Sequence, residues 1–200
     1  FIMKCVIMNH FNLRGIIMNR LYIIEGQDRC GKSTAVNLLR KKIKNPRLFV
    51  IHSSKPPIGV DVHAWTLAHY KHVVNYAIAL VVLGWDVIMD RSWLGETVYG
   101  PLYRNVNISL EELEDMFITN PMIDLETVKM LVLVDDASHI AMRSDGESMS
   151  DDLNMLEQER AAFKNSTLHT RIPNATLIDW EYEEFSVAAL DEIVEVMINA

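Results

Sequence analysis

A glycine-rich segment near the start of the chain carries residue types that bind phosphate groups. From Gly26 to Ser33 it follows the spacing G-x-x-x-x-G-K-[ST]. Glycines let the backbone approach a phosphate closely, and the N–H groups of such a loop face the phosphate oxygens. The lysine reaches the β- and γ-phosphates, and the hydroxyl after it ligates Mg²⁺. The residues expected to bind ATP here are Gly26, Gln27, Asp28, Arg29, Cys30, Gly31, Lys32, Ser33 and Thr34.

The segments on either side of this loop are those that the motif requires. Residues 21–24 form a short apolar, β-branched run that predicts a buried strand. Residues 35–43 carry apolar residues on one side and a basic last turn, which predicts a helix. A loop between a strand and a helix lies at the helix N-terminus, whose positive partial charge favours a polyanion. The sequence therefore predicts nucleoside triphosphate binding.

A second pair of chemically active side chains, Asp90 and Arg91, follows a later predicted strand at residues 86–89. In open parallel sheets, ligands bind beyond the carboxyl ends of the strands. We therefore expect this pair to face the phosphate-binding loop, whose Ser33 hydroxyl is a candidate Mg²⁺ ligand. The alternative is an ion pair that only closes the end of the strand.

The remaining segments alternate between strand and helix patterns. Further strands are expected at residues 48–51, 128–134 and 176–179, and further helices at residues 62–83, 95–103, 109–117, 136–143, 153–168 and 186–198. Such alternation predicts an α/β fold of three layers, with a five-stranded parallel sheet covered by helices on both faces. The polar segment 144–150 is expected to be a short, mobile lid.

Composition narrows the class of protein. The chain has 200 residues and a net charge of −8, which suits one domain and argues against nonspecific nucleic-acid binding. Cys5 and Cys30 are far apart, so we interpret both as reduced thiols of a cytoplasmic protein. No segment is long and apolar enough to cross a membrane. The guanine-binding signature N-K-x-D does not occur, which argues against a GTPase switch.

Several of these segments resemble thymidylate kinases. Residues 25–34 look like the family loop E-G-x-D-x-x-G-K-S-T, and residues 87–91 look like its strand-terminal Asp-Arg element. Residues 133–143 resemble the fourth strand, its Asp and a helix that ends in Arg. The resemblance runs from about residue 20 to the end. It implies an ATP-dependent kinase with the P-loop kinase fold in residues 19–200, preceded by an extension, residues 1–18, that we interpret as dispensable.

The resemblance also implies roles for individual residues. Lys32 and Arg29 would stabilise charge on the transferring phosphoryl group, as phosphoryl transfer requires. Asp90, with Ser33, would help hold Mg²⁺. Arg91 would clamp the acceptor phosphate, and Arg143 would approach the ATP phosphates. Because the segment 144–150 contains no arginine, the chain resembles the type that carries its catalytic arginine in the loop. The expected catalytic residues are Arg29, Lys32, Asp90 and Arg91.

The acceptor side departs from the family pattern. The family loop Arg-Glu-Pro-Gly-Gly is replaced by His52-Ser53-Ser54-Lys55-Pro56, so only Lys55 or His52 could substitute for the missing arginine. Residues 96–104 resemble viral thymidylate-kinase-like proteins more than cellular enzymes. His72 and Tyr76 share one face of the long helix and could line a pocket. The expected acceptor-binding residues are Asp28, Lys55, His72, Tyr76, Arg91, Tyr99 and Arg104.

Four functions remain open from the sequence. The leading one is phosphorylation of a pyrimidine deoxynucleoside monophosphate. The second is a phage kinase that phosphorylates the hydroxymethyl group of 5-hydroxymethyluracil in DNA, with Asp28 or Asp90 as base. The third is a deoxynucleoside kinase, and the fourth a non-catalytic ATP-binding module. The expected partners are a nucleotide, or hydroxymethylated DNA in the second case, and no membrane. We also consider a homodimer, and the host cytoplasm as the location if the protein is viral.

Overall fold

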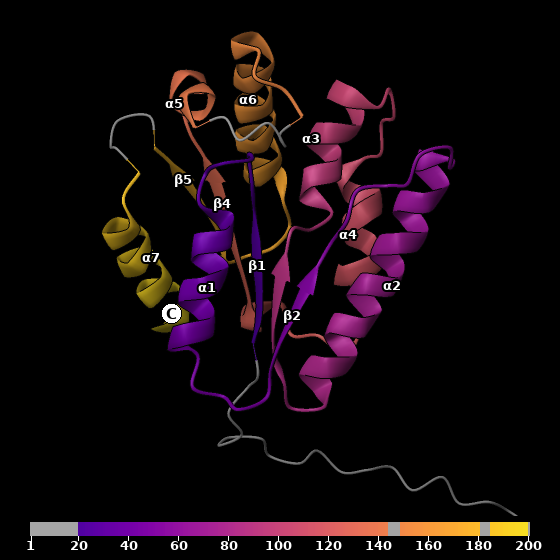
Figure 1. Cartoon of the computed structure of the whole chain (residues 1–200). Coiled ribbons are helices and arrows are strands. Elements are labelled where there is room, and N and C mark those ends of the chain that lie inside the picture. The colour runs from indigo at the N-terminus through magenta and orange to yellow at the C-terminus, as the bar shows by residue number, and fades with distance from the viewer. Residues whose placement is uncertain (1–19, 144–148, 181–184, 200) are drawn as a thin grey trace, which may run out of the picture.

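The central strand is β1 (Leu21–Gly26), whose six residues are all buried. In this computed structural model, which describes residues 20–143, 149–180 and 185–199, it lies between β3 (Asp86–Asp90) and β4 (Val128–Val134). The outer strands are β2 (Leu48–His52) and β5 (Ala175–Asp179). All five strands are parallel, in the order β2-β3-β1-β4-β5 (Figure 1). The five-stranded parallel sheet expected from the sequence is confirmed.

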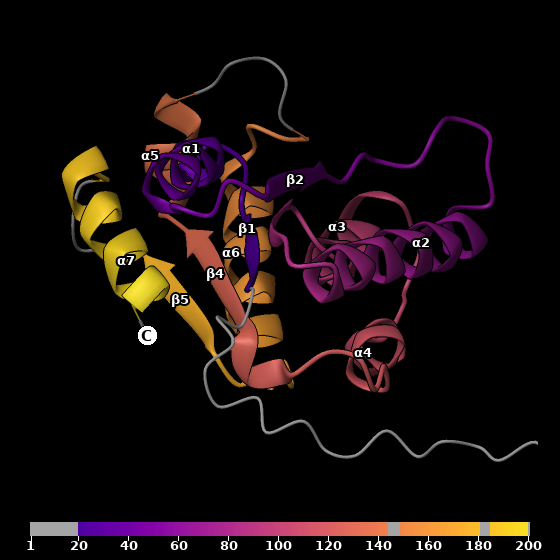
Figure 2. The same ribbon diagram turned by 90° about the horizontal axis from the view of Figure 1, so that it is seen from below.

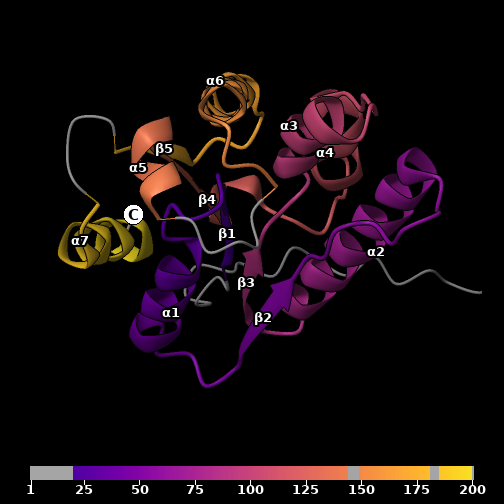
Figure 3. The ribbon, with the colours of Figure 1, turned by 45° about the horizontal axis from the view of Figure 1, so that its top comes forward.

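The helices cover both faces of this sheet, as the three-layer expectation requires (Figures 2 and 3). Helices α1 (Lys32–Lys42), α5 (Ala137–Met142) and α7 (Val187–Asn199) pack with Tyr22 and Ile24 of β1. Helices α2 (Val62–Val82), α3 (Leu94–Tyr103), α4 (Leu110–Ile118) and α6 (Leu153–His169) pack mainly with Leu21 and Ile23. Alternate residues of one apolar strand therefore build two cores, because successive side chains of a strand point to opposite faces.

Most element boundaries agree with the sequence patterns within a few residues. Ser109 caps α4 by accepting a hydrogen bond from the N–H of Glu112 at 3.1 Å, and Gly84, with a φ of 89°, follows the end of α2. Helix α3 includes Pro101 and ends at Tyr103. A short 3₁₀ helix, η1 (Leu125–Thr127), was not expected.

Two expectations fall wholly or partly outside the described residues. The extension 1–18, with Cys5, lies there, and so do residues 144–148 of the expected lid. Within the described part of the chain, no helix has the length and apolar character needed to span a membrane.

Gly26 shows how closely the phosphate-binding loop is packed against the sheet. Its φ is 131°, and a Cβ at this position would lie 1.9 Å from the carbonyl oxygen of Leu133 on β4. The next residue, Gln27, donates its N–H to that same carbonyl at 3.0 Å. Strand β4 therefore cannot move away from the phosphate-binding loop without losing this buried hydrogen bond.

Gly26→Ala should lower the free energy of unfolding by at least about 3 kcal/mol, because the new methyl group meets fixed backbone. Gly59→Ala is the matched control: its φ is 85°, but nothing lies within 4 Å of the added Cβ. That change should cost only about 1–2 kcal/mol of backbone strain. Urea denaturation measures both, and equal losses would contradict the packing argument.

Candidate active site

Three parallel strands end together at the candidate site. The register pairs Ile24 of β1 with Asp90 of β3, and the N–H of Arg91 donates to the carbonyl of Ile24 at 2.9 Å. The N–H of Ser53, just after β2, donates to the carbonyl of Asp90 at 3.1 Å. The phosphate-binding loop, the Asp90-Arg91 pair and the β2–α2 loop are therefore held side by side by backbone hydrogen bonds.

The loop between β1 and α1 has the conformation of an anion-binding concavity. Arg29 and Gly31 both have left-handed backbones, with φ values of 64° and 91°. Such turns direct successive N–H groups inward, toward a site at the N-terminus of the following helix. The ammonium of Lys32 donates to the carbonyls of Gly26, at 2.8 Å, and Gln27, and lies 3.3 Å from the carboxylate of Asp28. A positive charge is therefore fixed over the loop.

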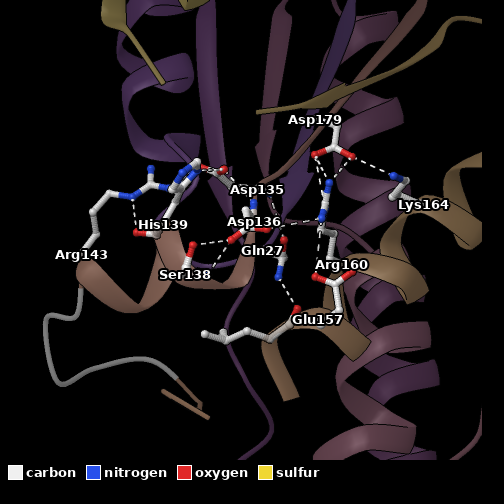
Figure 4. Close-up of polar contacts among 11 residues, drawn as sticks. Gln27, Asp135, Asp136, Ser138, His139, Arg143, Glu157, Arg160, Lys164 and Asp179 are labelled. Atoms are coloured by element: carbon white, nitrogen blue, oxygen red, sulfur yellow. Dashed lines mark hydrogen bonds and ion pairs between the residues drawn. The ribbon is translucent and has the colours of Figure 1, made fainter. Parts of the chain in front are cut away.

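Gln27 was expected to bind ATP, but its side chain is buried beneath the loop (Figure 4). Its amide nitrogen donates to the carbonyl of Leu156 on α6 at 2.8 Å. Its amide oxygen accepts the N–H of Asp135, just after β4, at 3.1 Å. Both ends of the amide are thus occupied by protein. The side chain positions the loop, and the backbone N–H of Gln27 is likewise held, by the carbonyl of Leu133, so Gln27 is not arranged to contact a phosphate.

The side chains of Arg29 and Cys30 are also held by contacts within the protein. The guanidinium of Arg29 donates to Asp151 at 2.7 Å and to the carbonyl of Ser150 at 3.1 Å, so it joins the loop to the last residue of the expected lid and the residue after it. The thiol of Cys30 is buried in the apolar cluster beside α1, and burial raises its pKa to about 12. Cys30 is therefore a neutral packing residue at physiological pH.

An ion pair joins the loop to the end of β3. A guanidinium nitrogen of Arg91 lies 2.7 Å from a carboxylate oxygen of Asp28. Burial alone would raise the pKa of Asp28, but the charges of Lys32 and Arg91 lower it below its ordinary value. Burial disfavours the charge of Arg91, yet Asp28 and Glu25 raise its pKa overall. Both groups are therefore ionised at neutral pH. The backbone of Arg91 is in the left-handed region, with a φ of 74°.

A cavity of about 320 Å³ opens beside this ion pair. Five of the expected acceptor-binding residues line it, namely Asp28, Lys55, Arg91, Tyr99 and Arg104. His72 and Tyr76 are not among its described lining residues. His72 is exposed on α2, and Tyr76 packs edge-on against Phe49 with ring centres 5.7 Å apart. The face of α2 that reaches the cavity is instead the one that carries the buried Tyr70.

Sequence reasoning missed Glu25, which is 1% exposed and lines the same cavity. Its carboxylate accepts the N–H groups of Gly26 at 3.0 Å, Ser92 at 2.7 Å and Gly95 at 3.2 Å. Burial raises its pKa, although Lys32 and Arg91 act against this. A glutamate at the end of an otherwise apolar strand was the available signal. The lining also contains Glu96, which forms an ion pair with Arg104.

The two expected metal ligands provide the oxygen atoms that Mg²⁺ prefers. Ser33 is exposed in the first turn of α1, and one carboxylate oxygen of Asp90 lies 2.9 Å from Nδ1 of His52. The described residues contain no cluster of three or more His, Cys, Asp or Glu suited to a metal. Mg²⁺ commonly takes only one or two protein oxygens and completes its shell with phosphates and water. The donor set therefore fits a nucleotide-bound Mg²⁺.

Arg143 lies at the C-terminal end of α5 (Figure 4). It forms an ion pair with the buried Asp135, donates Nε to the carbonyl of His139 at 3.0 Å, and lies 5.9 Å from the centre of the Phe185 ring. These residues and Met142 line a second cavity of about 200 Å³. Because the ring of Phe185 also packs against Gly31, this cavity adjoins the phosphate-binding loop.

Several solved structures share the fold of this chain. Thymidylate kinase from Candida albicans superposes with a TM-score of 0.62 at 17% identity, over 91% of this chain and 92% of that one. YorR protein from Bacillus subtilis, in complex with phosphorylated GDP, gives 0.59 at 18% identity, over 90% and 95%. Deoxyadenosine kinase from M. mycoides gives 0.50 at 13% identity, over 90% and 98%. No protein-family model and no curated protein sequence matches the chain.

The fold is that of the P-loop kinases. The identities are too low to carry an activity across, so the reaction has to be argued from the site itself.

Replacing Gln27 should test its supporting role. Gln27→Met keeps the length of the side chain but leaves the buried N–H of Asp135 without a partner, whereas the carbonyl of Leu156 keeps its bond within α6. The free energy of unfolding should fall by roughly 1–3 kcal/mol, the cost of one orphaned buried group. Gln158→Met, an exposed change on α6, should stay within about 0.5 kcal/mol of the wild type. Similar urea midpoints for the two variants would contradict this role.

Proposed function

We propose that the protein is an ATP-dependent kinase that phosphorylates a pyrimidine deoxynucleoside monophosphate. The observation that carries the proposal is the Arg91–Asp28 ion pair, which joins a phosphate-binding loop to the mouth of a separate cavity. A kinase needs two adjoining sites, one for the donor and one for the acceptor, with cations at the point where they meet. Lys32 and Arg91 are the cations at that point.

The roles of the residues follow from these positions. Loop N–H groups and Lys32 bind the phosphates of ATP, and Arg91 leaves Asp28 to bind the acceptor phosphate. Ser33 and Asp90 would hold Mg²⁺, which would supply neutralisation of the phosphate charge. Catalysis then rests on positioning and on electrostatic stabilisation of the transferring group. The catalytic role of Arg29 stays a prediction, because Asp151 and Ser150 hold its guanidinium.

The size of the acceptor cavity supports a small acceptor. Ligand pockets commonly span about 300–1,000 Å³, and this one, at about 320 Å³, lies at the lower end. Tyr70 and Tyr99 contribute aromatic surface to the lining. These features suit a single nucleotide, whose base can stack on aromatic side chains.

An acceptor screen with labelled ATP tests the proposal. Thymidine monophosphate should be phosphorylated faster than thymidine or duplex DNA containing 5-hydroxymethyluracil. Lys32→Ala should lower kcat at least about 100-fold, as loss of one transition-state charge contact does. Lys71→Ala, an exposed change on α2, serves as the control and should leave kcat unchanged. ATP binding without transfer to any acceptor would favour a non-catalytic ATP-binding module and would exclude the proposed reaction.

A second candidate, transfer to a hydroxyl group, is favoured by Glu25. A hydroxyl acceptor must lose a proton, whereas a monophosphate is already an anion at neutral pH. Glu25 is a carboxylate in the acceptor cavity whose pKa is raised by burial, which suits a general base better than an ordinary surface acid. The hydroxyl could belong to a deoxynucleoside or to a hydroxymethylated base.

Glu25→Gln should separate the two candidates within one protein. If Glu25 is the base, the variant should lose transfer to thymidine by at least about 100-fold while transfer to thymidine monophosphate falls much less. Both rates are measured on the same preparation, with the KM for ATP as a check on the loop. Parallel losses for both acceptors would show that Glu25 only holds Gly26, Ser92 and Gly95 in place.

The viral type, the loop-arginine class, a homodimer and a cytoplasmic location stay predictions from the sequence.

A further inference from the structure

Two buried hydroxyl groups lack a hydrogen-bond partner, and both belong to residues that line the acceptor cavity. Ser53 is 3% exposed and Tyr99 is 6% exposed, and neither hydroxyl oxygen has a partner among the described residues. Other buried side chains also have a polar atom without a hydrogen-bond partner, but among the described residues only Ser53 and Tyr99 of this group line the cavity. Buried polar groups are nearly always hydrogen-bonded, and an unsatisfied one destabilises a fold. The pair therefore needs a physical explanation.

The position of Ser53 is not explained by exposure or by local capping. Its neighbours His52, Ser54 and Lys55 are exposed, so the loop turns this one hydroxyl inward. Its backbone N–H is already used by the carbonyl of Asp90. Elsewhere the chain does satisfy such groups: the hydroxyl of Ser166 lies 2.9 Å from that of Thr97.

Both hydroxyls lie near the group that would handle the acceptor phosphate. Ser53 is fixed to Asp90, the residue before Arg91. Tyr99 is close enough to Asp28 and Arg91 for their charges to affect its pKa, which burial raises well above the ordinary value. Both residues therefore line the same cavity as the Asp28–Arg91 ion pair.

We propose that the Ser53 hydroxyl binds the acceptor, sharing with Tyr99 the hydrogen bonds to the sugar–phosphate end of the substrate. The proposal rests on the function proposed above. It assigns to the β2–α2 loop, through Ser53, a hydrogen bond to the acceptor. No described protein group bonds either hydroxyl, and the acceptor would supply the missing partner.

This account makes stability and binding change in opposite directions. Ser53→Ala and Tyr99→Phe should leave the melting temperature unchanged or raise it, because each removes an unsatisfied group. Each should raise the KM for thymidine monophosphate, or for thymidine if that is the better acceptor, about fivefold. The KM for ATP should not change.

Two controls remove the same atoms from satisfied positions. Ser166→Ala loses the bond to Thr97, and Tyr103→Phe loses the bond to Glu159. Both should lower the melting temperature by at least about 2 °C and leave the acceptor KM unchanged.

Ser53→Ala would overturn the inference if it melted as low as Ser166→Ala, or if it bound the acceptor as tightly as the wild type. Failure of the proposed function is a different result: neither acceptor would bind the wild type at all, and the melting comparison would still decide whether the Ser53 hydroxyl is unsatisfied.

Discussion

The ion pair between Arg91 and Asp28 is the interaction on which the candidate site depends. It joins the phosphate-binding loop after β1 to the end of β3, residues that lie 63 positions apart in the chain. Its two side chains are only 34% and 23% exposed, so neither is fully hydrated when the other is absent. Removing one partner of such a pair leaves a poorly solvated charge. The pair thus links the two halves of the site both structurally and electrostatically.

Buried polar groups help to fix the conformation of the phosphate-binding loop. The carboxylate of Glu25 accepts hydrogen bonds from the N–H groups of Gly26, Ser92 and Gly95. The side chain of Gln27 is hydrogen-bonded both to the residue after β4 and to α6. Left-handed backbone at a residue other than glycine is strained and persists only where surrounding contacts fix it. Arg29 and Arg91 both have such backbones, and both lie next to these buried groups. Rigid support of this kind is what a site that works by positioning requires.

The sequence predicted the fold and the phosphate-binding loop because both are encoded locally. Alternating strand and helix patterns place the elements, and the glycine and lysine spacing marks the loop. The acceptor side was harder for a physical reason. Spacing shows that His72 and Tyr76 share a face of α2, but not that Tyr70 on another face reaches the cavity. Glu25 and Ser53 gain their meaning from contacts made across the sheet, which no short pattern contains.

The charges around the acceptor cavity bear on which acceptor it can hold. Among its described lining residues, both arginines are already paired, Arg91 with Asp28 and Arg104 with Glu96. Lys55 is exposed, so it provides only a weak, screened attraction. A doubly charged phosphate must therefore draw Arg91 away from Asp28. Asp28 would then interact more strongly with Lys32, 3.3 Å away, at the donor loop. Acceptor binding would in this way alter the charge that faces ATP, which couples the two substrates without any movement of the sheet.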